Sequence, residues 1–145
     1  MLTSRGDRIA AFNFKGDVAG EWDFDADVSC LSVDGGPAGE ETVLVGLTNG
    51  EVWKVFVNHP LPQLLLRHPD GIKRAATSLD KTELGVVDDM NRFCVYDLTT
   101  TKTILEEEAV TGFAFNRETN DAVCYGGQGV LLIRIGSLPV EPCPV

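Results

Sequence analysis

Turn-forming residues recur along this chain at intervals of about 40 residues. Asp7, Gly50, Asn91 and Gly129 each end a turn-like stretch directly before a run with strand character, and they stand 43, 41 and 38 residues apart. Glycine and asparagine accept the positive φ angles that tight hairpin turns require. A period of this length indicates a chain built from repeated structural units.

Each repeat divides into short runs rich in Val, Leu, Ile and Phe, separated by Gly, Asn and Asp, which is the pattern of strands and hairpins. In the third repeat the predicted strands are 72–79, 83–88, 92–98 and 102–108. The others are 8–14 and 18–24 in the first repeat, 27–33, 42–47, 51–57 and 62–68 in the second, and 121–125 and 130–135 in a fourth that begins at residue 109. Four antiparallel strands per repeat of about 40 residues is typical of a β-propeller blade.

Burial explains why such sheets repeat. One four-stranded sheet exposes two faces and is marginally stable alone, whereas stacked blades cover each other's faces. We therefore expect an all-β propeller fragment of about three four-stranded blades plus one extra hairpin. The expected boundaries are 1–138 for the partial propeller, divided into a blade remnant at 1–26 and blades at 27–69, 70–108 and 109–138, with a Pro-rich tail at 139–145.

The number of blades leaves two interpretations open. A propeller ring typically needs about 4–8 blades, which is more than these repeats supply. Either the segment is part of a larger ring, or two copies associate so that each covers the exposed blade faces of the other. The sequence does not indicate which face binds partners.

The charge of the chain argues against several classes of partner. There are 22 acidic and 12 basic residues, a formal charge of -10. Such a surface repels nucleic-acid phosphates and anionic lipids, and the densest basic pair is only Lys73-Arg74. No apolar run approaches the roughly 20 residues of a membrane-spanning helix. With no secretory signal pattern at the N-terminus, we expect no nucleic acid, no membrane insertion and a cytosolic location.

The four cysteines have no metal-binding spacing. Cys30, Cys94 and Cys124 each lie within an apolar run, and Cys143 lies near the end of the sequence. Buried free thiols are common in such runs, so we expect core packing in a reducing compartment. His59 and His68, both followed by proline, are the only histidines and are also too far apart for a metal-ligand motif. We expect no metal ion and no cofactor.

Acidic residues are the only conceivable catalytic groups. Asp88, Asp89 and the run 106–108 would be the acids of a hydrolase acting on a cationic or sugar substrate. However, adjacent residues of a strand point to opposite faces, and no nucleophile–base pair accompanies them. A solvated blade edge, or an acidic strip that docks a basic partner, explains residues 106–108. We therefore expect no enzyme activity and name no catalytic residue.

Other motifs have structural explanations as well. The glycine runs at 35–39 and 126–129 lead into strands, not into the helix that a phosphate-binding loop requires. Trp22 and Trp53 are expected to pack between blades, with recognition of a partner as the alternative. Residues 73–78, "KRAATS", carry a weak phosphorylation signal.

One strand indicates the type of propeller. "RFCVYDL", residues 92–98, resembles the third strand of a WD repeat, in which apolar positions precede an aromatic residue and an aspartate. Phe93, Val95, Tyr96 and Asp97 supply that pattern. The resemblance makes the expected fold a WD40-type β-propeller.

A longer segment points to a narrower family. Residues 35–57, "GGPAGEETVLVGLTNGEVWKVFV", resemble a run in the second propeller of the intraflagellar transport protein 122 family. Residues 86–98, 112–116, 124–131 and Pro139-Val140 continue the likeness in the same order. The family provides WD-repeat subunits of intraflagellar transport complex A, and it brings no catalytic residues.

The resemblance implies a role and a location. It implies a non-catalytic scaffold in retrograde ciliary transport and in the entry of membrane proteins into the cilium. The implied partners are the other complex A subunits, together with the remaining propeller blades of the parent chain or a second copy. The implied location is the cytoplasm, the cilium and the ciliary basal body. A generic WD-repeat scaffold of another cytosolic complex is the alternative.

Overall fold

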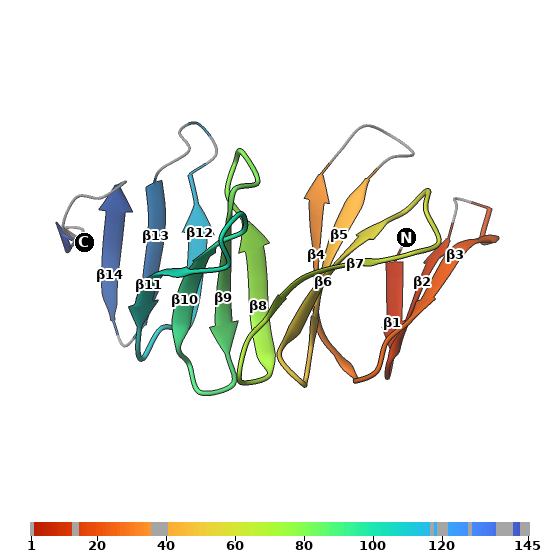
Figure 1. Ribbon diagram of the computed structural model, residues 1–145, viewed down its shortest axis with the longest axis horizontal. Coiled ribbons are helices and arrows are strands. Elements are labelled where there is room, and N and C mark those ends of the chain that lie inside the picture. Colours follow the sequence, from red (N-terminus) through yellow and green to blue (C-terminus); the bar gives the residue numbers. More distant parts are fainter. Residues whose placement is uncertain are drawn as a thin grey trace. The chain divides into compact units, whose positions relative to one another are not determined.

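The regular structure of this chain consists of β-strands. The computed structural model describes residues 2–12, 15–35, 41–116, 118, 122–127, 129–135 and 141–142, and in these ranges there is no helix. Hydrogen bonding joins the strands into one three-stranded and three four-stranded sheets (Figure 1). The all-β class predicted from the hairpin pattern is therefore confirmed.

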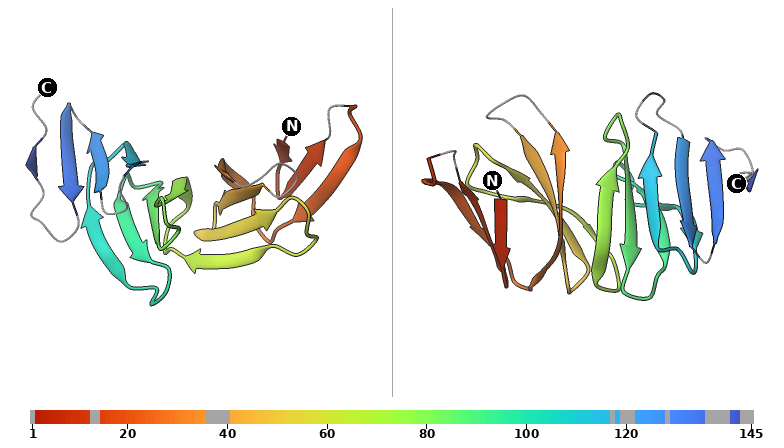
Figure 2. Two further views of the ribbon diagram at one scale, coloured as in Figure 1. Left: turned by 90° about the horizontal axis from the view of Figure 1, so that it is seen from above. Right: turned by 180° about the vertical axis from the view of Figure 1, so that it is seen from behind.

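The first of two compact units, Met1–Ala75, holds the first two sheets. The first sheet has the order β1 (Leu2–Arg5), β2 (Arg8–Phe12), β3 (Val18–Asp23). The second has the order β4 (Val28–Gly35), β5 (Thr42–Leu47), β6 (Glu51–Phe56), β7 (Gln63–Arg67). Neighbouring strands in both sheets pair antiparallel (Figures 1 and 2).

These two sheets share one apolar core. Alternate residues of β2 and β5 point into it, as the two-residue period of a strand requires. The buried members are Ile9, Ala11, Trp22, Phe24, Val43, Val45, Leu47 and Val55. Each large side chain contributes roughly 1.5–3 kcal/mol when it leaves water, so the contact between the sheets is a main source of stability in this unit.

The second unit, Ala76–Val145, is built on the same plan, and the boundary between the units falls within β8. The third sheet has the order β11 (Thr103–Glu107), β10 (Phe93–Asp97), β9 (Glu83–Asp88), β8 (Ile72–Thr77). The fourth has the order β12 (Gly112–Phe115), β13 (Ala122–Gly127), β14 (Val130–Ile135), β15 (Glu141–Pro142). Figure 2 shows β12, β13 and β14 side by side.

Aromatic rings dominate the core of the second unit. The ring of Phe93 lies 4.8 Å from that of Phe113 and 5.0 Å from that of Tyr125, centroid to centroid. Phe93 belongs to the third sheet, and the other two rings belong to the fourth. A Cβ atom at Gly85 would lie 2.6 Å from the Phe113 ring, so a glycine at this position leaves the space that the ring fills.

The predicted repeat has a counterpart in backbone hydrogen bonds. In each of the first three sheets, the segment that follows the last strand donates a hydrogen bond to the predicted turn residue. The amides of Phe24, His68 and Val110 donate to the carbonyl oxygens of Asp7, Gly50 and Asn91, at 2.8, 2.8 and 2.9 Å respectively. These three turns are therefore structurally equivalent, and each joins the strands that occupy the same position in their sheets.

Two details differ from the sequence-based expectation. The first sheet is not a hairpin, because β1 adds a third strand. The residues of β1 after Leu2 are polar and exposed, so they carry no apolar signal, and pairing with β2 defines the strand. At the other end, Glu141 and Pro142, within the segment interpreted as a tail, pair with β14 as β15. An edge strand tolerates proline because its outer N–H needs no partner.

Candidate functional site

Each unit contains a small hollow lined by described residues. The volumes are about 240 Å³ in the first unit and about 210 Å³ in the second. Pockets for small-molecule ligands usually have about 300–1,000 Å³. Both hollows are below that range.

The hollow of the first unit lies between β3 and the segment that follows β6. Trp22 is 3% exposed, and its indole nitrogen donates a hydrogen bond to the carbonyl oxygen of His59 at 3.0 Å. Gly20 leaves room for the indole, since a Cβ there would lie 2.8 Å from the Trp22 ring. Trp22 is thus held as a core residue, which agrees with the expected packing between sheets.

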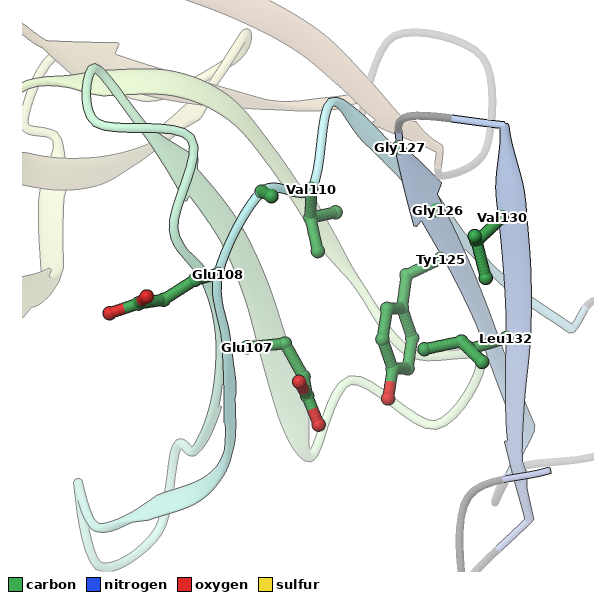
Figure 3. Close-up of a pocket in the computed structure, with 9 residues that line it drawn as sticks. Glu107, Glu108, Val110, Tyr125, Gly126, Gly127, Val130 and Leu132 are labelled. Atoms are coloured by element: carbon green, nitrogen blue, oxygen red, sulfur yellow. The ribbon is translucent and has the colours of Figure 1, made fainter. Parts of the chain in front are cut away.

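The hollow of the second unit contains an unusual tyrosine. Tyr125 is 1% exposed, and its buried hydroxyl oxygen has no partner in full hydrogen-bond geometry among the described residues, although it lies close enough to the Glu107 carboxylate to interact with it. Figure 3 shows the ring between Glu107 on one side and Val130 and Leu132 on the other. Burial, reinforced by the negative charge of Glu107, raises the pKa of Tyr125 to about 12, and Arg134 opposes this shift. The hydroxyl therefore stays protonated and does not act as a base near neutral pH.

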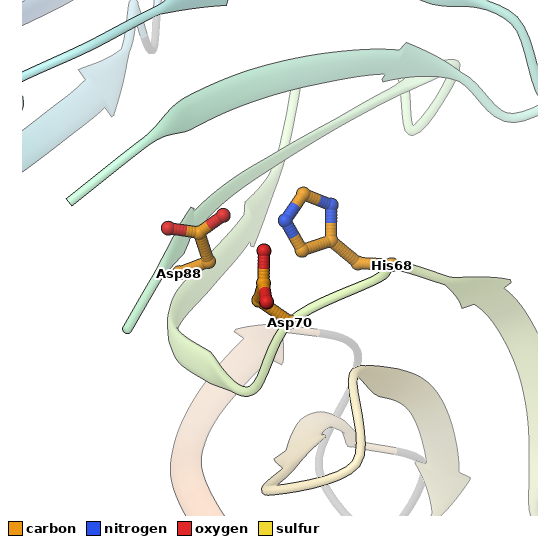
Figure 4. A group of neighbouring side chains, drawn as sticks. All are labelled: His68, Asp70 and Asp88. Atoms are coloured by element: carbon orange, nitrogen blue, oxygen red, sulfur yellow. The ribbon is translucent and has the colours of Figure 1, made fainter. Parts of the chain in front are cut away.

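A hydrolase would use Asp88 as one of its acids, but in the structure Asp88 stabilises a turn. It ends β9 and is 0% exposed (Figure 4). Its Oδ1 accepts hydrogen bonds from the backbone amides of Met90 and Arg92, both at 2.9 Å. The two bonds hold a hairpin in which Asn91 has a φ of 58°. A carboxylate used this way is typical of a structural turn.

The remaining acids do not form a catalytic pair. Glu106 and Glu108 are exposed, and Glu107 is half-buried between them. Glu106 lies 3.7 Å from the Arg92 guanidinium, as an exposed ion pair. Figure 3 shows Glu107 turned toward Tyr125 and Glu108 turned away from it. Asp89 is also exposed, in the turn after β9.

The two histidines lie in connecting segments. The Nδ1 atom of His59 accepts a hydrogen bond from the amide of Leu61 at 3.1 Å, within its own loop. His68 follows β7 and is 4% exposed; Figure 4 shows it with Asp70, in the same connection. Within the described part of either unit taken alone, no three His, Cys, Asp or Glu side chains converge as metal ligands.

Two of the thiols are poor nucleophiles. Cys30, Cys94 and Cys124 form no disulfide bond within the described residues. Burial raises the pKa of the Cys94 thiol to about 11, and burial also raises the pKa of Cys30. Since the thiolate is the reactive form, both cysteines remain protonated at neutral pH. Cys143 lies outside the described residues.

Four further features have structural roles or fall partly outside the described residues. Ser78, at the end of "KRAATS", is 1% exposed, and its Oγ donates to Asp80 at 2.8 Å. Its burial argues against phosphorylation in the folded state.

Gly126 and Gly127 belong to β13, which pairs with β14. Of the run 35–39, only Gly35 is described. Trp53 is half-buried and bonds to Glu51.

The described residues also contain no helix with the length and apolarity needed to cross a membrane.

Comparison with known proteins agrees with the repeat and the hairpin pattern. A family model described as the IFT122 second β-propeller matches residues 1–144. The chain belongs to the IFT122 second β-propeller family. The four sheets are accordingly those of a β-propeller, and the family resemblance inferred from residues 35–57 is confirmed.

Curated members of the IFT122 family show the same relationship. The intraflagellar transport protein 122 homologs of Xenopus tropicalis and Danio rerio are each 35% identical to this chain over 134 residues, and that of Homo sapiens is 32% identical. Each match covers 92% of this chain. The chain spans about 11% of the length of these relatives.

Proposed function

We propose that this chain is a propeller segment of a non-catalytic scaffold that holds partners in intraflagellar transport complex A. The observation that carries the proposal is the match of residues 1–144 to the IFT122 second β-propeller. The shared cores of the sheets support it, because the side chains of largest apolar area pack against neighbouring sheets. The small hollows and the structural use of Asp88 offer no support for a hydrolase.

Each sheet is proposed to be one blade. The remnant then spans 1–26 and the blades span 27–69, 70–108 and 109–138, with 139–145 as the tail that contributes β15. The proposed partners are the other complex A subunits and the remaining blades of the parent chain. The proposed processes are retrograde ciliary transport and entry of membrane proteins into the cilium, with location in the cilium, the basal body and the cytoplasm.

Co-purification tests this proposal. The tagged full-length parent is expressed in ciliated cells, and its partners are identified by mass spectrometry. We expect complex A subunits to co-purify. A parent carrying Val95→Asp, in a residue that is 0% exposed, should recover less of them, because a buried unpaired charge disrupts the fold.

The matched control places the same substitution at the surface. Asp at Thr99, which is exposed in the loop after β10, should leave the fold intact and preserve co-purification. Recovery of no complex A subunit with the unaltered parent would refute the assignment. Recovery of a different set of subunits would favour a scaffold in another complex.

A further inference from the structure

The hollow of the second unit combines a carboxylate with apolar surface. One wall is the end of β11 and the segment that follows it, with Glu107 and Val110, and the other wall is formed by β13 and β14. Val130 and Leu132 make the second wall apolar, and Figure 3 shows the Tyr125 ring between the two walls. A side chain that enters this hollow therefore meets a negative charge and apolar groups together.

The polar groups of the hollow lack strong partners. The Tyr125 hydroxyl is buried and has no partner in full hydrogen-bond geometry among the described residues, although it interacts with the Glu107 carboxylate. No ion pair joins Glu107 or Glu108 to a basic side chain that the structure describes. The charge of Arg134 acts on Tyr125, but Arg134 does not line the hollow. Because buried polar groups are normally bonded, the hollow is suited to a further hydrogen-bond donor.

The charge around the hollow favours a cationic donor. Glu107 and Glu108 follow Glu106, whose own charge is offset by Arg92 in an ion pair at 3.7 Å. Figure 3 shows the carboxylate of Glu107 turned toward Tyr125, so the unpaired charge of this residue lies at the hollow itself. Complementary charge steers partners to a surface and suppresses wrong ones. A cation therefore matches this site, and an anion would be repelled.

Close backbone contacts fix the walls of the hollow. A Cβ atom at Gly127 would lie 2.2 Å from the carbonyl oxygen of Ala109, so the two walls approach each other closely at this point. The amide of Thr111 also donates a hydrogen bond to the carbonyl oxygen of Gly126 at 2.9 Å. A site whose walls are in place before binding pays less for ordering when a side chain enters it.

We propose that this hollow binds an arginine side chain from an exposed basic segment of a partner protein. The guanidinium pairs with the Glu107 carboxylate beside the Tyr125 hydroxyl, and the apolar stem of the arginine packs against Val130 and Leu132. Arginine fits better than lysine, because its planar fork of N–H donors can bond to a carboxylate and to a neighbouring oxygen together. The inference rests on the proposed scaffold function, since it names the kind of segment that the scaffold holds.

Titration with short synthetic peptides tests the proposal. The probe carries one central arginine between glycine and serine residues, with both ends blocked, and NMR of the backbone amides follows its binding to the 145-residue chain. We expect saturable shifts of the Glu107 and Leu132 amides. A peptide with citrulline, the neutral isostere of arginine, should bind at least about tenfold more weakly, because it lacks the charge that strengthens the hydrogen bonds.

Substitutions separate this site from general attraction by acidic residues. Glu107→Gln should weaken binding of the arginine peptide about tenfold or more. Glu106→Gln removes the same charge from the neighbouring exposed position and should change binding less than about twofold. Val130→Trp, at a position that is 53% exposed, fills the hollow without a change of charge and should also weaken binding about tenfold.

The same titrations include the results that would overturn the proposal. It fails if the arginine peptide causes no saturable shift, if the citrulline peptide binds equally well, or if Glu106→Gln weakens binding as much as Glu107→Gln. The dispersion of each amide spectrum shows whether the variant is folded, and Val130→Trp keeps the test decisive if Glu107→Gln is not. None of these outcomes depends on binding to complex A, so the inference and the proposed function can fail separately.

Discussion

The indole nitrogen of Trp22 donates a hydrogen bond to the carbonyl oxygen of His59, 37 residues further along the chain and 3.0 Å away. Trp22 lies in β3 of the first sheet, and His59 lies between β6 and β7 of the second. The bond therefore links β3 of the first sheet to the β6–β7 connection of the second. Both sheets contribute residues to the core that contains Trp22. It also satisfies the polar atom of a side chain that is otherwise buried among apolar residues.

Replacement of Trp22 by Phe should measure this link. The substitution removes the donor and part of the ring, so we expect the free energy of unfolding to fall by about 1–3 kcal/mol. Urea titrations of the 145-residue chain, followed by circular dichroism, provide the measurement. The half-buried Trp53 bonds to Glu51 only two residues away, so Trp53→Phe is the control and should cost less. Equal costs would contradict the proposed linking role.

Gly50 should be far less tolerant of substitution than Gly16. Both have positive φ angles, 92° and 86° respectively. A Cβ at Gly50 would lie 1.9 Å from the carbonyl oxygen of His68, whereas one at Gly16 would meet no described atom within 4 Å. Gly16→Ala should cost about 1–2 kcal/mol for backbone strain, and Gly50→Ala should cost about 1–3 kcal/mol more. Thermal melts of the two variants compare them, and similar melting temperatures would argue against the close approach at Gly50.

Asp88→Ala should destabilise the third sheet. No enzyme activity is expected to be lost with it. The change leaves the amides of Met90 and Arg92 without the carboxylate that accepts their hydrogen bonds. We expect a loss of about 1–3 kcal/mol, measured by urea titration. Asp88→Asn, which keeps a side-chain oxygen, should lose less, and Ala at the exposed Asp89 should lie within about 0.5 kcal/mol of the original chain. Hydrolysis by the original chain that Asp88→Asn abolishes would instead favour the enzyme alternative.

Tyr125→Phe should change the free energy of unfolding by less than about 1 kcal/mol. The substitution keeps the ring that contacts Phe93, and it removes a buried hydroxyl that interacts with Glu107 without full hydrogen-bond geometry. Tyr125→Ala, the matched control, should cost about 3–5 kcal/mol, because it removes the ring as well. Urea titrations at pH 7 measure both changes. A clear loss of stability in Tyr125→Phe would show that the hydroxyl makes a bond that is important in solution.

The same tyrosine predicts a pH dependence with a definite sign. The pKa of Tyr125 is raised to about 12 in the folded chain, whereas an unperturbed tyrosine titrates near 10. Between these values the unfolded chain releases its proton first, so the contribution of Tyr125 to stability falls as the pH rises. Tyr125→Phe should therefore lose less stability than the original chain over about pH 10–12. If the free energies of unfolding of the original chain and of Tyr125→Phe fall in parallel over this pH range, the raised pKa is contradicted.

Strand positions were largely predictable from the sequence, because alternating burial leaves a local pattern. The predicted runs 42–47, 83–88 and 130–135 coincide with β5, β9 and β14. The spacing of Asp7, Gly50 and Asn91 also identified turns that proved structurally equivalent. By contrast, β1 has no apolar alternation, and β15 contains a proline. Both depend on backbone pairing with a neighbouring strand, which no local pattern records.

The sequence by itself therefore determined the repeat, most of the strands and the family, since turn geometry and alternation act over a few neighbouring residues. Only the tertiary structure decided how Asp88, Trp22 and Tyr125 are used. A carboxylate, an indole or a phenol is the same chemical group whether it lies in a turn, in a core or in a catalytic site. Their roles depend on groups brought near by folding, such as the His59 carbonyl beside Trp22 and the Glu107 carboxylate beside Tyr125.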